Sequence, residues 1–222
     1  MDVNALYDFD RKEGMIVEYP IKIVSIVHIE KLKMFYAGIM AGFKHLKTEL
    51  DSLPVVRNGL GYRPEFYNQV LNEMRKNAIV GLFHLWLREL QHFLAIGGDV
   101  INKNKNVFLN KGHEFILGLF ANERELTPII YILEKYGCLT NVIKHGLGNS
   151  FEKLSDEFLY EPDEYKESIV IDGEAYDSSV AEAPFVLQSH IDELYNATIQ
   201  FWEKVPEIFV VDCNILLKKN AR

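Results

Sequence analysis

The chain has 222 residues, of which 48% are hydrophobic and 25% are charged, and this composition is typical of a globular protein. A chain of this length can bury most of its apolar surface without disulfide bonds. The formal net charge of −8 argues against broad, nonspecific binding of nucleic acid, because the phosphate backbone would be repelled on average. A local basic pocket is compatible with that charge.

The two cysteines, Cys138 and Cys213, match no zinc or redox spacing, so we expect free thiols in a reducing compartment. The first residues carry no basic region followed by an apolar stretch, which predicts no signal peptide and a cytoplasmic protein. The most apolar window, residues 78–96, contains four ionisable side chains. These favour a buried core helix over a membrane span.

Two long helices are predicted in the first half of the chain. Apolar residues at helical spacing predict a helix over about 21–51, although the β-branched start leaves a strand over Ile21–Val27 as an alternative. Pro64 suits the first turn of a second helix over about 64–96. The later part of this helix is apolar on most sides, which predicts the central helix of the domain. Gly97-Gly98 is expected to end it.

Shorter helices are predicted in the second half, over residues 128–136, 139–145 and 184–204. Thr127 and Pro128 suit the N-cap and the first residue of the first of them, and Gly137 is a natural C-terminal stop. Gly146 and Gly148 are expected to break the second.

The remaining segments predict only small additions to a helical protein. Residues 99–113 form a polar connection, and Asp172-Gly173 lies between β-prone runs over about 168–177, which favours a short hairpin. Ile208–Val211 fits either a late strand or a packed tail. Because no repeat, linker or low-complexity run divides the chain, we expect a single all-α domain over residues 1–222. It is predicted to be a helical bundle with a short β-hairpin insertion.

Polar residues, helical spacing and a chain turn coincide in Leu139–Ser150. Asn141 and His145 are four residues apart, so they would share one face of a helix, with Lys144 beside them. An imidazole can exchange a proton near neutral pH, a lysine can hold a phosphate as a point charge, and an asparagine can orient a ligand. These are the parts of an RNA-cleaving site. The alternative is that Asn141 and His145 cap a helix end and bond to backbone.

The same stretch resembles a known signature, through the run Asn141-x-x-Lys144-His145-Gly146-x-Gly148-x-Ser150. It is similar to the motif of the HEPN superfamily of helical domains, in which an Arg, a polar residue and a His lie on a late helix. The predicted helix order agrees, and the ending Phe201-Trp202-x-x-x-Pro206 resembles bacterial members with a similar Asn-x-x-Lys-His-Gly stretch. The resemblance covers about residues 64–206, a HEPN-like core preceded by the long helix 21–51.

The resemblance implies particular roles for the motif residues. It assigns the catalytic His to His145 and the polar residue to Asn141. The family's arginine, which binds the scissile phosphate, falls on Thr140, and a threonine cannot supply that charge. Lys144 could replace the charge, but it lies at a different angle of the helix.

Two functions follow from the resemblance. The first is a metal-independent protein that cleaves or binds RNA in a toxin–antitoxin or phage-defence system, acting as a homodimer whose two motifs face one cleft. It implies no cofactor and no metal ion, and its partners would be RNA, a second copy and an antitoxin or other protein. The second is a non-catalytic dimerisation or interaction module that has lost the nuclease arginine.

Several ionisable residues lie outside the motif. Proteins of the resembling family often carry a Glu on the central helix, which makes Glu89 a candidate to orient Asn141, Lys144 or His145. Glu89-x-x-His92 also fits half of a di-iron motif, but no second copy is found. We therefore expect a buried polar layer there, formed by His84, Arg88, Glu89 and His92, in which Arg88 is paired to a carboxylate.

The other histidines are given ordinary roles. His113-Glu114, and His190 with Asp192-Glu193, are interpreted as solvated surface or ordinary helix charge. The aromatic residues Tyr195, Phe201 and Trp202 are interpreted as core rather than as a platform for stacking bases.

Overall fold

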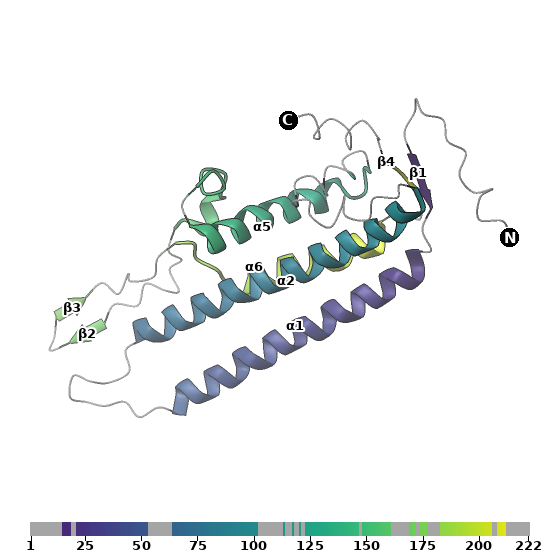
Figure 1. The fold of residues 1–222 in the computed structure, drawn as a ribbon. Coiled ribbons are helices and arrows are strands. Elements are labelled where there is room, and N and C mark those ends of the chain that lie inside the picture. Colours follow the sequence, from purple (N-terminus) through teal and green to yellow (C-terminus); the bar gives the residue numbers. More distant parts are fainter. Residues whose placement is uncertain are drawn as a thin grey trace.

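The structure is a computed structural model, drawn as a ribbon in Figure 1. It describes residues 15–18, 21–52, 64–101, 113, 117, 120, 123–146, 148–160, 169–171, 174–176, 183–205 and 208–211.

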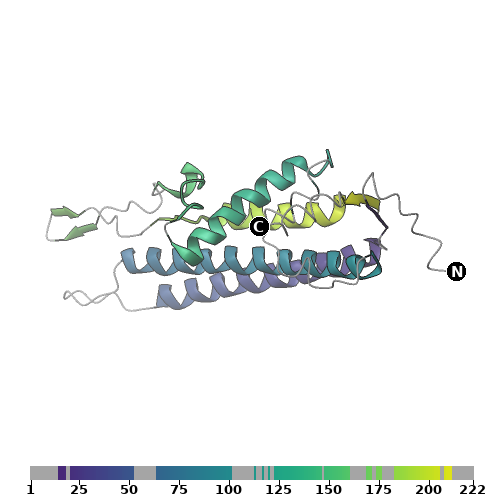
Figure 2. The ribbon, with the colours of Figure 1, turned by 45° about the horizontal axis from the view of Figure 1, so that its top comes forward.

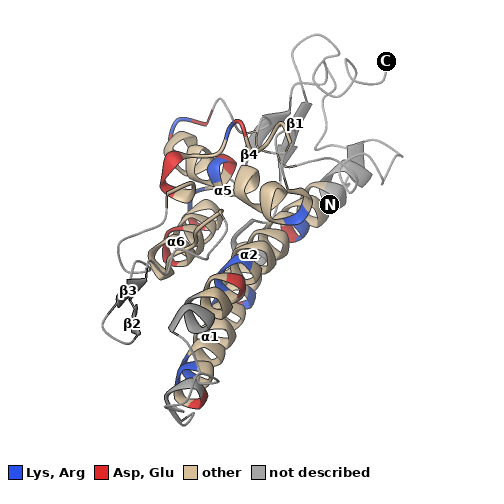
Figure 3. Cartoon of the chain, turned by 90° about the vertical axis from the view of Figure 1, so that its left-hand side faces the viewer, with Lys and Arg blue, Asp and Glu red and all other residues tan. Residues whose placement is uncertain are grey.

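The described helices form an all-α packed bundle of four, and the all-α class agrees with the prediction from hydrophobic spacing. They are α1 (Ile21–Ser52), α2 (Pro64–Ile101), α5 (Thr127–His145) and α6 (Gln188–Lys204). Helices α2 and α6 each pack against the other three, whereas α1 and α5 flank this central pair (Figures 1 and 2). Figure 3 shows α5 and α1 on opposite sides of α2, with α6 beside it. None of the described helices combines the length and hydrophobicity needed to cross a bilayer.

Large aromatic side chains form the centre of the bundle where α2 meets α6. The rings of Trp86 and Phe201 lie 5.3 Å apart in an edge-to-face arrangement, and those of Phe93 and Trp202 lie 5.6 Å apart in the same geometry. All four side chains are almost completely buried. Burying a large apolar side chain contributes about 1.5–3 kcal/mol, so this layer accounts for a large share of the stability of the fold. It confirms Phe201 and Trp202 as core.

Helix α1 is joined to α6 through Tyr36. Its hydroxyl donates a 2.6 Å hydrogen bond to Asp192, and its ring stacks on Tyr195 with the centroids 4.1 Å apart. Burial, together with the bonded carboxylate, raises the pKa of Tyr36 to about 12. The hydroxyl therefore stays protonated and keeps donating this bond at neutral pH.

Two predicted features of the long helices can be compared with the structure. Helix α1 begins at Ile21, so the alternative of a strand over Ile21–Val27 is wrong. Helix α2 runs through Gly97-Gly98 to Ile101, so the predicted stop at this pair is also wrong. A glycine costs a helix only about 1 kcal/mol relative to alanine, which is a weak signal at the end of a long packed helix.

Gly137 does not end a helix, and the two helices predicted on either side of it are one continuous helix, α5. A Cβ at Gly137 would collide with the ring of His113. The glycine therefore allows close packing rather than a change of chain direction. His113 is itself buried, and its ring meets Phe83 edge-on at 5.6 Å, so the interpretation of His113 as solvated surface is wrong.

Helix α5 ends where the glycines predicted. Gly146 has a φ of +70°, and its N–H donates a 2.8 Å hydrogen bond to the Val142 carbonyl. Turns over residues 148–153 and the 3-10 helix η2 (Asp156–Phe158) follow. Phe158 is fully buried and carries this segment back onto the bundle.

Helix α6 begins at Gln188 rather than at the predicted residue 184. The side chain of Asn72 on α2 explains the difference. Its amide donates to the Pro184 carbonyl at 3.3 Å and accepts from the Val186 N–H at 2.9 Å. These bonds hold the backbone of residues 184–186 against α2, so those residues cannot join the helix.

Among the described residues, four short strands lie outside the bundle. They are β1 (Met15–Glu18), paired antiparallel with β4 (Ile208–Val211), and β2 (Ile169–Ile171), paired antiparallel with β3 (Glu174–Tyr176). The second pair lies where the Asp172-Gly173 turn favoured a hairpin, and that dipeptide itself is outside the described residues. Most of the predicted connection 99–113, and Cys213, also lie outside them.

Candidate functional site

The motif residues lie on the last two turns of α5. Asn141 is half-buried, while Lys144 and His145 are exposed. Asn141 and His145 line an open depression of about 440 Å³, together with Gly146, Gly148, Asn149 and Ser150. The helical spacing therefore brings Asn141 and His145 to one surface, as expected, whereas Lys144 does not line this depression.

Thr140 faces the interior of the bundle. It is only 1% exposed, and its hydroxyl has no hydrogen-bond partner within the described part of the chain. The position onto which the family's arginine falls is therefore turned away from the depression at Asn141 and His145. An arginine at this position could not hold its guanidinium over that depression without leaving the packed interior.

Lys144 is close enough to α2 to influence His84. Burial lowers the pKa of the His84 imidazole, and the charge of Lys144 lowers it further. Lys144 forms no ion pair with any carboxylate among the described residues. The charge at the end of α5 thus acts on a half-buried imidazole of α2, a relation that the sequence did not suggest because the two residues are far apart in the chain.

A second depression, of about 520 Å³, lies between α1 and α2. Its lining consists of Phe35, Gly81, His84, Leu85, Leu87, Arg88 and Gln91. Phe35 comes from α1 and the other residues from α2. The polar residues His84, Arg88 and Gln91 recur every three or four positions, so they share one face of α2. The depression combines an aromatic ring and aliphatic side chains with a guanidinium, an imidazole and an amide.

The predicted buried polar layer on α2 is mostly wrong. Arg88 and His92 are exposed and His84 is half-buried, and only Glu89 is buried. The reason is helical geometry, because positions 84, 88 and 92 lie on one face, whereas position 89 is rotated by about 100° from position 88. The exposed face carries the three basic side chains and the buried face carries the acid.

Glu89 is bonded to α1. One carboxylate oxygen lies 2.8 Å from His28 Nδ1 and 2.8 Å from Lys31 Nζ. Burial acts to raise the pKa of Glu89, but the Lys31 hydrogen bond and the charges around it lower the pKa below its ordinary value. These contacts join α1 to α2. The role of orienting Asn141, Lys144 or His145 stays a prediction for Glu89.

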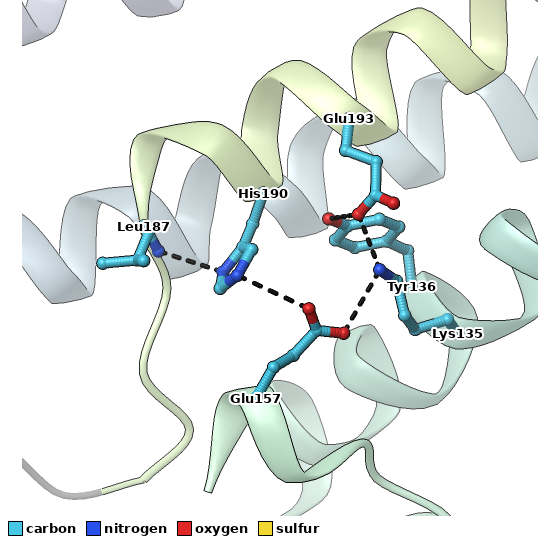
Figure 4. A network of polar contacts seen from close by, with 6 residues as sticks. All are labelled: Lys135, Tyr136, Glu157, Leu187, His190 and Glu193. Atoms are coloured by element: carbon cyan, nitrogen blue, oxygen red, sulfur yellow. Dashed lines mark hydrogen bonds and ion pairs between the residues drawn. The ribbon is translucent and has the colours of Figure 1, made fainter. Parts of the chain in front are cut away.

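A polar network that the sequence did not reveal joins α5, η2 and α6 (Figure 4). Lys135 Nζ lies 2.6 Å from the Glu193 carboxylate and 3.2 Å from that of Glu157, and the Tyr136 hydroxyl donates to Glu193 at 2.6 Å. His190 Nδ1 accepts a 3.1 Å hydrogen bond from the Leu187 N–H. Its Nε2 lies 3.9 Å from Glu157.

The network accounts for the burial of His190 and for the shifted pKa values of His190 and Glu193, two residues that were expected at the surface. His190 is buried, so its interpretation as solvated surface is wrong, and burial lowers the pKa of its imidazole. Burial acts to raise the pKa of Glu193, but the bonds from Lys135 and Tyr136 lower it overall. Lys135 and Glu193 are 58 residues apart, so no local spacing could have paired them.

The two depressions offer acid–base and cationic groups. Among the residues that the structure describes, no three or more His, Cys, Asp or Glu side chains are grouped so that they could hold a metal ion. His145 at the first depression and Arg88 at the second supply the chemistry that an anionic ligand would meet. Comparison of the chain with protein-family models, with curated proteins and with solved structures gives no match.

Proposed function

We propose that the chain is a HEPN-like protein that binds RNA at the C-terminal end of α5 and cleaves it without a metal ion. One observation carries the proposal: Asn141 and His145 lie together at an open depression, and Lys144 is exposed on the same turn. A helix end whose polar groups were all satisfied internally would not leave these side chains accessible. The setting that the resemblance suggests is a toxin–antitoxin or phage-defence system in the cytoplasm.

The chemistry of the proposed reaction needs only side chains of this kind. His145 takes the proton of a ribose 2′-hydroxyl, and the oxygen then attacks the adjacent phosphorus. The bond from phosphorus to the 5′-oxygen breaks, leaving a 2′,3′-cyclic phosphate and a 5′-hydroxyl that gains a proton. In the homodimer that the resemblance suggests, the His145 of a second copy donates this proton. Asn141 orients the imidazole or the phosphate.

A second candidate is a non-catalytic interaction module, and two observations favour it. Thr140 is buried, so the arginine of the resembling nucleases has no counterpart there. Helix α1 also exposes several apolar side chains, among them Met34, which is 76% exposed, and Ile26 and Val27, about two turns earlier in the helix. Apolar groups on one helix of a bundle are typical of a surface that contacts another protein.

The test is cleavage of a single-stranded RNA oligonucleotide by the purified full chain in the presence of a metal chelator. We expect cleavage by the wild type and a loss of about 100-fold or more in the His145→Ala variant, since general acid–base groups contribute that much. His45→Ala is the matched control, because His45 is exposed on α1. Binding without cleavage favours the second candidate, and neither binding nor cleavage contradicts the proposal.

A further inference from the structure

The exposed face of α2 carries basic side chains that the proposed reaction does not use. His84 and Arg88 lie on successive turns of this face, between the two flanking helices α1 and α5. Arg88 forms no ion pair with a carboxylate in the described part of the chain, because the neighbouring Glu89 is bonded to His28 and Lys31. The chain has a net charge of −8, so a helix face whose arginine is not neutralised by a carboxylate is unexpected and favours an anionic ligand.

The lining of the depression around these residues is apolar on one part and basic on another. Phe35 and Leu85 supply apolar surface, and the Phe35 ring is 38% exposed, although it packs closely over Gly81. Arg88 and His84 supply a planar cation and an imidazole. A nucleotide has the same two parts, an aromatic base that stacks on a ring and a phosphate that a guanidinium binds through two hydrogen bonds.

The charge of Lys144, on the last turn of α5, acts on His84 at the second depression. Lys144 follows the Asn141 and precedes the His145 that line the first depression. Helices α5 and α2 pack against each other, so this relation is part of the bundle. An RNA strand that reached both depressions would meet two exposed cations, Lys144 and Arg88.

We propose that the depression lined by Phe35, His84 and Arg88 is a second nucleotide subsite for single-stranded RNA, in addition to the one at Asn141 and His145. Arg88 binds the phosphate and Phe35 contacts the base. Arg88 thereby adds a phosphate contact from α2, at a depression other than that of Asn141 and His145. This inference rests on the proposed RNA-binding function and names its substrate class.

The shape of the site favours single strands. In an A-form duplex the bases are stacked and paired, so a base could not enter a depression of this size. Unpaired bases can leave the stack and lie against an aromatic side chain, and this contact is tolerant of sequence. The subsite therefore predicts a preference for single-stranded RNA over duplex RNA, with little dependence on the identity of the base.

The experiment measures binding by fluorescence anisotropy, at one low salt concentration, of a short single-stranded oligoribonucleotide with 2′-O-methyl groups that prevent cleavage. We expect Arg88→Ala to weaken binding about tenfold and Arg88→Lys to weaken it less, because lysine keeps the charge but loses the planar fork. Phe35→Ala is expected to weaken it about fivefold or more. Arg124→Ala is the matched control, because Arg124 is exposed at the opposite end of α5.

The outcomes separate this subsite from the proposed function. If His145→Ala or Lys144→Ala weakens RNA binding while Arg88→Ala and Phe35→Ala bind like the wild type, the subsite is overturned and the proposed function stands. If no RNA binds but adenosine monophosphate binds in a manner that depends on Arg88, the depression is a mononucleotide site, and both the RNA subsite and the proposed function fail. Equal or tighter binding of the duplex, or binding of neither RNA nor the nucleotide, overturns the subsite.

Discussion

Lys135 donates a 2.6 Å hydrogen bond to the Glu193 carboxylate and so joins α5 to α6. The same ammonium lies 3.2 Å from Glu157, in the 3-10 helix that follows α5. The Lys135 side chain is only 15% exposed, so water cannot readily replace either carboxylate. Glu157 lies in the segment 148–160, whose first residues line the depression at His145. One side chain therefore stabilises the bundle and holds the wall of the candidate site.

We predict that Lys135→Met lowers the free energy of unfolding by about 1–2 kcal/mol, because it leaves two carboxylates without their shared cation. The expected loss is moderate since both carboxylates are 39% exposed and solvent screens part of the interaction. Chemical denaturation of the full chain measures it. Lys33→Met is the control, because Lys33 pairs with Glu30 at the exposed surface of α1, and it should leave the stability unchanged. Equal losses in the two variants would contradict the structural role of Lys135.

Gly137 provides a second test, of close packing inside α5. A methyl group at this position meets the His113 ring, so Gly137→Ala should destabilise the fold by about 1–3 kcal/mol, in spite of the higher helix propensity of alanine. Thermal unfolding followed by circular dichroism measures the change. Gly38→Ala in α1 is the matched control, because a Cβ there meets no atom within 4 Å. That variant should be about 0.5–1 kcal/mol more stable.

Gly137 and the segment 184–186 show why the helices could be predicted from the sequence but some of their ends could not. Hydrophobic spacing and the positions of proline and glycine are local properties of the sequence. They therefore predicted where α1 and α2 begin and where α5 ends, at Gly146. Gly137 and the segment 184–186 depend on contacts with His113 and Asn72, which come from other parts of the chain. From sequence alone, a glycine predicts the end of a helix, both where the helix does end and where the glycine instead allows another side chain to pack closely.

The candidate site also has features that follow from local sequence spacing and features that depend on packing between helices. The shared surface of Asn141 and His145 follows from their spacing of four residues, and the structure places both at one depression. The burial of Thr140 depends on which face of α5 meets the bundle, and the partners of Glu89 lie on α1. Neither could be read from the motif, because a short motif specifies residue types and not the packing around them.

Acidification should destabilise the protein through His190. Burial lowers the pKa of this imidazole; Glu157 and Glu193 oppose the change, whereas Lys135 and Arg75 add to it. A lowered pKa means that the unfolded chain binds the proton more readily than the folded one. The stability from neutral His190 is therefore present above its ordinary pKa of 6.5 and is lost as the pH falls through the lower folded value.

The measurement is the midpoint of thermal unfolding between about pH 7 and pH 5, where histidines titrate. We expect the midpoint of the wild type to fall over this range and that of His190→Gln to fall less, because glutamine cannot take up the proton. His45→Gln, at an exposed position of α1, should keep the wild-type dependence. A dependence in His190→Gln as steep as in the wild type would assign the effect to other groups, among them the buried His28.

The hydroxyl of Thr140 is buried without a hydrogen-bond partner among the described residues, so its removal should be favourable. Thr140→Val keeps the shape of the side chain and should stabilise the fold by about 1 kcal/mol. Thr198 is the matched control, because it is also buried but donates a 2.7 Å hydrogen bond to the Tyr195 carbonyl. Thr198→Val should therefore lose about 0.5–1.5 kcal/mol in the same denaturation experiment.

Thr140→Arg would restore the residue of the resembling nucleases, yet we predict that it does not restore their site. A guanidinium at a position that is 1% exposed must be buried without a partner or displace α5 from the bundle, at a cost of about 3 kcal/mol or more. Denaturation should show this loss, and RNA cleavage should not rise above that of the wild type. A Thr140→Arg protein as stable as the wild type and more active on RNA would show that position 140 can reach the depression at His145. It would then assign the phosphate contact at that depression to α5.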